Sequence, residues 1–126
     1  MKRIIATQTA PAAVGPYSQA VVAGNLMFCS GQIALDPATG SMVGASPAEQ
    51  TEQVLKNVSA LLAAEGLSLT DVVKATVFAT DMGAFAAVNE VYARFFTSEP
   101  PARSFVEVSA LPKNALVEIE VIAYKR

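Results

Sequence analysis

The sequence contains no histidine and only one cysteine, Cys29, and these scarcities remove several kinds of chemistry. Ser-His-Asp and Cys-His catalysis both need an imidazole, as do zinc sites built on histidine. A lone cysteine cannot form a disulfide within the chain, which favours a reducing compartment. We therefore expect Cys29 to be a small buried apolar residue rather than a nucleophile, and we expect no metal site.

Charged residues are also scarce, at 16% of the chain against 52% hydrophobic residues, with a net charge of -2 and a pI near 5.0. Nucleic-acid binding usually needs a clustered basic face, so we expect no nucleic-acid partner. Polar residues, glycine and proline interrupt every apolar run well before the roughly 18 residues of a membrane span. The basic start is likewise broken by Gln8, Thr9 and Pro11 before a signal peptide could form. These features predict a soluble, cytoplasmic protein without a membrane partner.

None of the seven glycines lies in a Walker-type loop or a G-x-G-x-x-G motif, so we expect no nucleotide cofactor. A length of 126 residues predicts one domain, residues 1–126, with one core. The mean hydropathy of +0.40 is high for a domain of this size. We therefore expect copies of the chain to cover part of one another's apolar surface.

Hydrophobic periodicity and turn residues predict six strands and two helices in the order β-β-β-α-β-α-β-β. The expected strands are residues 2–7, 17–23, 26–30, 72–79, 104–108 and 116–123. Ser46, Pro47 and Glu49 form a capping box that starts the first helix, and Gly66 follows its end. Asp81 caps the second helix. This order predicts an α+β fold in which two helices pack on one face of a single mixed sheet.

Both helices carry an apolar stripe that should form the core. The two stripes are Val54, Leu55, Val58, Leu61 and Leu62, and Phe85, Val88, Tyr92, Phe95 and Phe96. Strand parity should show which side chains meet these stripes, because neighbours along a strand point to opposite faces. The uniformly apolar sets are Val73, Ala75, Val77 and Ala79, then Val106 and Val108, then Val117, Ile119, Val121 and Ala123. We expect these sets to face the helices, which would place Arg103 and Glu118 together on the other face.

Arg103 follows the rigid segment 100–102 and lies at the start of an apolar strand. Removing water from a guanidinium at such a position costs free energy. Its planar guanidinium can bind a carboxylate through two parallel hydrogen bonds. A C=N bond conjugated to a carboxylate needs only to be held while water reaches the carbon and a proton reaches the nitrogen. Arg103 could hold that carboxylate, and Glu118 could orient and deprotonate the water.

Simpler roles remain open for these residues. Arg103 could be a salt-bridge partner of Glu107 or Glu120 at an interface. Glu118 and Glu120 could form the solvated face of an edge strand, and Tyr17 could be an ordinary packing residue. The residues alone do not decide between these roles and the catalytic one.

Several motifs resemble the Rid family, also called the YjgF family. They are 15–20 (GPYSQA), 30–32 (SGQ), 88–92 (VN-x-x-Y), 101–108 (PARS-x-VEV), 111–112 (LP) and 117–119 (VEI). The resemblance runs essentially from end to end. It implies a chorismate-mutase-like α+β fold, assembled as a homotrimer with a site in each cleft between subunits.

The resemblance also implies an activity, since the best-known branch of the family contains 2-iminobutanoate/2-iminopropanoate deaminases. These enzymes hydrolyse reactive enamine and imine intermediates to 2-keto acids and ammonia, as a form of metabolite damage control, without a cofactor. Arg103 matches the family's carboxylate-binding arginine, and Glu118 matches its water-positioning acid. Other positions match residues that line or support the pocket: Tyr17, Ser30, Gly31 and Asn89.

Phe105 departs from that branch, which has a cysteine at this position. A phenylalanine beside Arg103 would make the pocket narrower or more apolar and would change substrate preference. Two alternative functions stay open: an endoribonuclease or translation inhibitor, with Arg103 holding phosphate, and a noncatalytic metabolite sensor that uses the same cleft.

Overall fold

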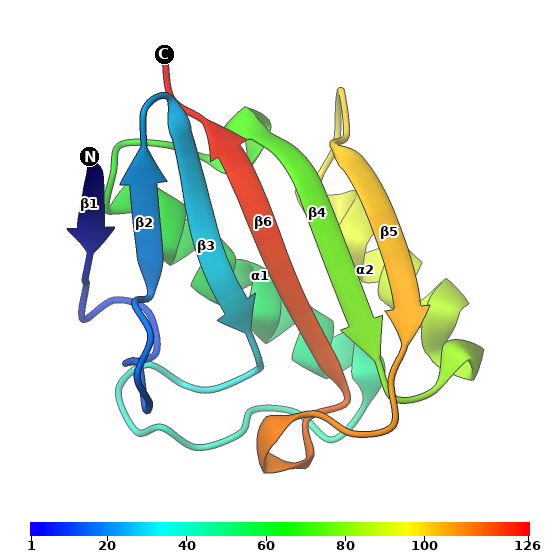
Figure 1. Cartoon of the computed structure of the whole chain (residues 1–126). Helices are drawn as coiled ribbons and strands as arrows, with labels where there is room; N and C mark the ends of the chain where they lie inside the picture. Colours follow the sequence, from blue (N-terminus) through cyan, green and yellow to red (C-terminus); the bar gives the residue numbers. More distant parts are fainter.

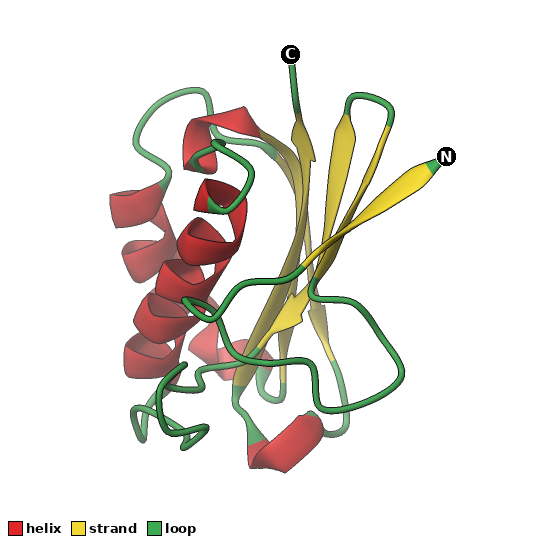
Figure 2. Ribbon diagram, turned by 90° about the vertical axis from the view of Figure 1, so that its left-hand side faces the viewer, coloured by secondary structure: helices red, strands yellow, loops and turns green.

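The computed structural model describes residues 1–126 and contains one six-stranded mixed sheet with two helices on one face. Figure 1 views the uncovered face of the sheet, and Figure 2 shows the helices and the sheet as two layers. The sheet order is β1-β2-β3-β6-β4-β5. The strands are β1 (Lys2–Ile5), β2 (Ala20–Ala23), β3 (Leu26–Gln32), β4 (Val72–Ala79), β5 (Ala102–Glu107) and β6 (Val117–Tyr124). The helices are α1 (Pro47–Ala63) and α2 (Phe85–Phe95), so the expected element order and layer arrangement are confirmed.

Helix α1 begins where its capping residues predict. The Ser46 side chain accepts a hydrogen bond from the Glu49 backbone N–H at 3.2 Å. The Glu49 carboxylate accepts from the backbone of Ala45 rather than from that of Ser46, so the reciprocal bond falls one residue earlier than expected. Past the other end, Gly66 adopts a φ of 73° and Leu67 donates to the Leu62 carbonyl, which closes the helix.

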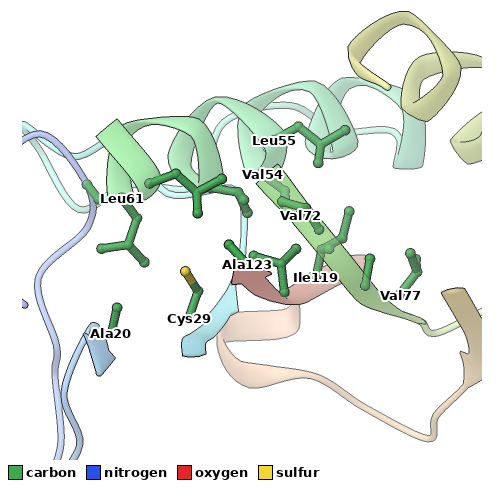
Figure 3. Close-up of a cluster of buried hydrophobic side chains, with 14 of the residues drawn as sticks. Ala20, Cys29, Val54, Leu55, Leu61, Val72, Val77, Ile119 and Ala123 are labelled. Carbon is green, nitrogen blue, oxygen red and sulfur yellow. The ribbon is translucent and has the colours of Figure 1, made fainter. Parts of the chain in front are cut away.

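The core lies between α1 and the helix-facing side of the sheet (Figure 3). All five residues of the expected α1 stripe are fully buried, and the apolar set of β6 is no more than 2% exposed. Each large apolar side chain buried here stabilises the fold by roughly 1.5 to 3 kcal/mol. Cys29 is also buried in this core, and burial raises the pKa of its thiol to about 12. The prediction that Cys29 is a structural residue is confirmed.

Helix α2 connects β4 to β5, which pair in parallel at one edge of the sheet. Asp81 does not cap α2 itself, because its carboxylate accepts from Gly83 and caps a 3-10 turn, Met82–Ala84, that leads into the helix. Tyr92 of the expected stripe is buried, but Phe85 is 42% exposed at the start of α2. The aromatic stripe is therefore only partly core.

The side-chain orientation expected from strand alternation is confirmed for β6 but is wrong in part of β4 and in β5. In β4 an irregularity between Val72 and Lys74 turns Val72 into the core and leaves Val73 47% exposed. In β5 the expected orientation is reversed, because the register pairs Arg103 with Ala75. Paired residues share a face, and Ala75 is fully buried beneath the helices. Arg103 and Phe105 therefore face α2, whereas Val106 faces the other side and is 38% exposed.

No helix of this chain covers the face of the sheet opposite α1 and α2. Exposed apolar side chains on it include Ile4, Phe28 and Val106, each between 38% and 51% exposed. Most monomeric proteins expose such residues singly rather than across a whole sheet. No helix has the length and apolar character needed to cross a membrane.

Candidate functional site

Arg103 lies under α2 at the outer edge of the sheet, in a polar and aromatic niche. Its Nη1 donates a 2.7 Å hydrogen bond to the Asn89 side-chain oxygen. Its guanidinium carbon lies 4.8 Å from the centroid of the Tyr92 ring, 5.4 Å from that of Phe105 and 5.8 Å from that of Phe85. Such ring contacts hold a cation in place at a modest energetic gain. We call this group the arginine half-site.

Arg103 forms no ion pair within the chain. The three salt bridges of the structure involve other residues. The Glu107 carboxylate accepts instead from the Met82 backbone N–H at 2.7 Å, and Glu120 is exposed on the opposite face of the sheet. Neither of the expected salt-bridge partners therefore neutralises Arg103 in one chain. A half-buried guanidinium without an acidic partner is suited to binding an anion from outside.

Glu118 lies on the uncovered face of β6 and leans over Gly31 of β3. A Cβ atom on Gly31 would come within 2.4 Å of the Glu118 Oε2 atom, so only glycine leaves room for this carboxylate. Burial, and then the like charge of Glu120, raise the pKa of Glu118 above the ordinary value of a glutamate. Glu118, Gly31 and Tyr17 line one pocket of about 80 Å³, together with residues such as Lys113. We call this group the glutamate half-site.

Tyr17 and Ser30 have different positions in the glutamate half-site. Tyr17 is 50% exposed, so it is not an ordinary core tyrosine. The Ser30 hydroxyl donates to the Ser18 carbonyl at 2.6 Å, and the Ser30 backbone N–H donates to the Gln19 carbonyl. Ser30 thus ties the end of β3 to the loop that carries Tyr17. Within the chain it supports the pocket rather than opening into it.

The structure does not bring Arg103 and Glu118 together, contrary to the expectation from strand parity. Glu118 pairs with Phe78 across β4, whereas Arg103 pairs with Ala75, an odd number of residues away on the same strand. The two side chains therefore point to opposite faces of the sheet. They also lie two strands apart, about 10 Å across the sheet, and their partners lie three residues apart along β4, about another 10 Å. Asn89 and Phe105 accompany Arg103, and Tyr17, Ser30 and Gly31 accompany Glu118.

Another hollow, of about 550 Å³, lies along β1 and the loop that follows it. Its lining shares Ala12, Tyr17 and Gln19 with the pocket of the glutamate half-site, but none of its lining residues is charged. It therefore offers a small anion no counter-charge. No group of three or more cysteine, aspartate or glutamate side chains is arranged to hold a metal ion.

Two residues of the arginine half-site are not among the site residues expected from the sequence: Phe85 and Tyr92. Both fit the apolar stripe of α2, and that pattern predicts core positions for them. The available signal was the spacing of Phe85, Asn89 and Tyr92, at positions i, i+4 and i+7, which places them on one face of a helix. Asn89, a polar residue between two aromatic rings on that face, marks it as different from a plain core stripe.

These features define a small α+β protein with an unpaired arginine under one helix and a half-buried carboxylate on the opposite side of the sheet. The family model described as Endoribonuclease L-PSP matches residues 7–125. A 2-iminobutanoate/2-iminopropanoate deaminase of Capra hircus is 49% identical, over 98% of this chain and 90% of its own. Other relatives are named only as RutC family proteins.

Solved structures of similar sequence share this fold. A crystal structure from Thermotoga maritima MSB8 is 58% identical, with a TM-score of 0.96, and covers 100% of this chain and 99% of its own. A structure of E. coli TdcF with bound serine is 46% identical, with a TM-score of 0.94, over 98% of this chain and 99% of its own. The chain belongs to the Rid (YjgF) family.

The contact between Glu118 and Gly31 gives a test of the glutamate half-site. We expect Gly31→Ala to push the carboxylate into solvent and to lower the pKa of Glu118 towards its ordinary value, because burial is the main cause of its shift. The displaced atoms end a flexible side chain, so stability should change by less than about 1 kcal/mol. Carboxyl carbon NMR across a pH titration measures the pKa. Gly15→Ala is the control, since its Cβ would meet only the Tyr17 ring at an ordinary 3.4 Å. An unchanged Glu118 pKa in Gly31→Ala would contradict this account.

Proposed function

We propose that the protein is a hydrolytic deaminase of small imino and enamino acids, such as 2-aminoacrylate, 2-iminopropanoate and 2-iminobutanoate. The observation that carries the proposal is the Arg103 guanidinium, which is half-buried and held by Asn89 and three rings but lacks an acidic partner. An arginine held in this way can bind the carboxylate of such a substrate through charge-assisted hydrogen bonds worth roughly 1.5 to 3 kcal/mol each. The deaminase name of one relative and the serine bound to another agree with a small amino-acid-like ligand.

The reaction needs few groups. An enamine such as 2-aminoacrylate first gains a proton at its methylene carbon and loses one from nitrogen, which gives the imine. Water then adds to the carbon of the C=N bond while Glu118 accepts a proton from it, and the nitrogen gains a proton to give a carbinolamine. The C–N bond then breaks, ammonia leaves, and the carbon becomes the carbonyl of a 2-keto acid. Glu118 is suited to the proton transfers because its raised pKa brings it closer to neutral pH than an ordinary glutamate.

We further propose that each site forms between two chains of a homotrimer, with Arg103 from one chain and Glu118 from its neighbour. Two observations support this arrangement: the half-sites lie on opposite faces of one sheet, and the uncovered sheet face carries exposed apolar residues such as Phe28. Self-association would bury that face. In this arrangement Tyr17 and Gly31 from the neighbour join Asn89 and Phe105 around the substrate. A cytoplasmic location, where amino-acid metabolism produces such imines, fits the single buried cysteine.

A direct test generates 2-aminoacrylate in situ with a serine dehydratase and follows release of the keto acid. We expect the protein to accelerate this release and Arg103→Ala to abolish the acceleration while the oligomer stays intact by size exclusion. Glu118→Gln should abolish it too, whereas a noncatalytic sensor would keep its function in that variant. Incubation with RNA covers the endoribonuclease alternative, in which cleavage would have to disappear in Arg103→Ala. Wild-type protein without any effect on the imine would contradict the proposal.

The pH dependence of the hydrolysis should report the ionisation of Glu118, which must be deprotonated to act as a base. Because its pKa is raised, activity should fall on acidification at a pH above that of an ordinary glutamate. Glu120→Gln removes a like charge, so it should move this acid limb to lower pH, while burial keeps part of the shift. The measurement is kcat/KM against pH, corrected for spontaneous hydrolysis, with Glu52→Gln on α1 as control. An acid limb that stays in place or moves to higher pH, in an intact oligomer, would be the opposite result.

A further inference from the structure

Phe85 and Phe105 form an aromatic pair beside the Arg103 guanidinium. Their rings meet edge to face, with 4.8 Å between centroids and an interplanar angle of 60°. Phe105 also packs against the hydrophobic core, so its ring is held from behind. Phe85, in contrast, is 42% exposed at the start of α2, which is a high exposure for an aromatic side chain.

The contact between Phe85 and Phe105 indicates a separate role for each ring. Phe105 takes up the space beneath Phe85, so Phe85 cannot turn inward against the sheet and remains at the rim of the arginine half-site. A smaller side chain at position 105 would leave a gap there, and close-packed interiors tend to fill such gaps. Phe105 thus acts as a support that keeps an apolar ring exposed beside the anion-binding group.

A bound substrate would contact this pair through its side chain. The carboxylate of a 2-imino acid takes the free N–H groups of Arg103, because Nη1 already binds Asn89. The carbon that bears the side chain is bonded directly to that carboxylate. Both therefore lie close to rings whose centroids are 5.4 and 5.8 Å from the guanidinium carbon. A side chain of one carbon covers little of these rings, whereas a longer apolar one can lie along Phe85.

We propose that the Phe85–Phe105 pair is a specificity wall, so that the protein hydrolyses 2-imino acids with apolar side chains of three or more carbons faster than those with one or two. This proposal rests on the deaminase function proposed above. Each methylene that the wall removes from water should raise kcat/KM by up to about fourfold. Amino acids with larger apolar side chains, oxidised to their imines, are the class of precursor that would supply these substrates.

The test uses an amino-acid oxidase to convert alanine, 2-aminobutyrate, norvaline, norleucine and phenylalanine to their imines. The rate of imine loss is followed with and without the protein by competition with semicarbazide trapping. We expect kcat/KM to rise on the order of tenfold or more from the alanine product to the norleucine product. In Phe105→Cys this ratio should shrink several-fold. The ratio is taken within one variant, so a general loss of activity cancels, and circular dichroism with size exclusion shows that the variant is folded and assembled.

Two further variants complete the design. Phe85→Ala should lose the same selectivity, because it removes the exposed ring itself. Phe95→Leu is the matched control, since Phe95 lies on the same helix and packs against the core but does not contact Arg103. A flat or inverted series in the wild type, or an unchanged ratio in both Phe105→Cys and Phe85→Ala, would overturn the wall and leave the deaminase function standing. Absence of acceleration for every imine would overturn both proposals.

Discussion

The alternation of side chains across the sheet is the constraint on which the candidate site depends. Parallel pairing of β4 with β5 fixes Arg103 opposite Ala75 and turns it under α2, while antiparallel pairing of β4 with β6 fixes Glu118 opposite Phe78 on the other face. No rotamer change can bring the two groups together through a hydrogen-bonded sheet. If they act on one substrate, as we propose, they must come from different chains. Burial of the uncovered apolar face of the sheet would then stabilise the association of the chains.

Both half-sites keep a polar group in an environment that does not favour it. The Arg103 guanidinium is partly desolvated and donates one hydrogen bond, to the Asn89 side chain, without an opposing charge. The Glu118 carboxylate is partly buried beside another acid, which raises its pKa. Removing water from a charged group costs free energy unless a partner compensates it. Groups held in this way contribute little to folding and are typical of places where a ligand completes the interactions.

Local sequence signals predict the fold well where one physical effect dominates. Ser46, Pro47 and Gly66 define α1 because capping groups and a left-handed glycine are local requirements of a helix. The β6 pattern is clear because two acids, Glu118 and Glu120, alternate with fully apolar residues on the other face. In β5 the pattern fails: both alternating sets of that edge strand contain large apolar residues, and only pairing with β4 decides between them. The shift at Val72 in β4 likewise depends on its neighbour β6 rather than on its own sequence.

The site was predictable in its residue types but not in its geometry. Arg103 and Glu118 stand out from their chemistry and from the family resemblance, yet their separation depends on pairing between strands that are distant in sequence. The aromatic stripe of α2 predicts core positions for Phe85 and Tyr92, because such a stripe on a helix usually packs there. Their contact with Arg103 arises only when β5 places its polar side beneath α2. A motif can therefore identify the groups that act on a substrate without showing which of them share a chain.

The most direct measurement of the shared site uses hybrid oligomers made from two inactive variants. Arg103→Ala and Glu118→Gln are unfolded together in equal amounts, refolded and assayed for hydrolysis of 2-aminoacrylate. If each site takes Arg103 from one chain and Glu118 from its neighbour, random mixing leaves about one quarter of the sites with both native groups. The account then predicts recovery of about one quarter of wild-type activity. Activity that stays at the level of the separate variants, in oligomers shown to contain both chains, would contradict it.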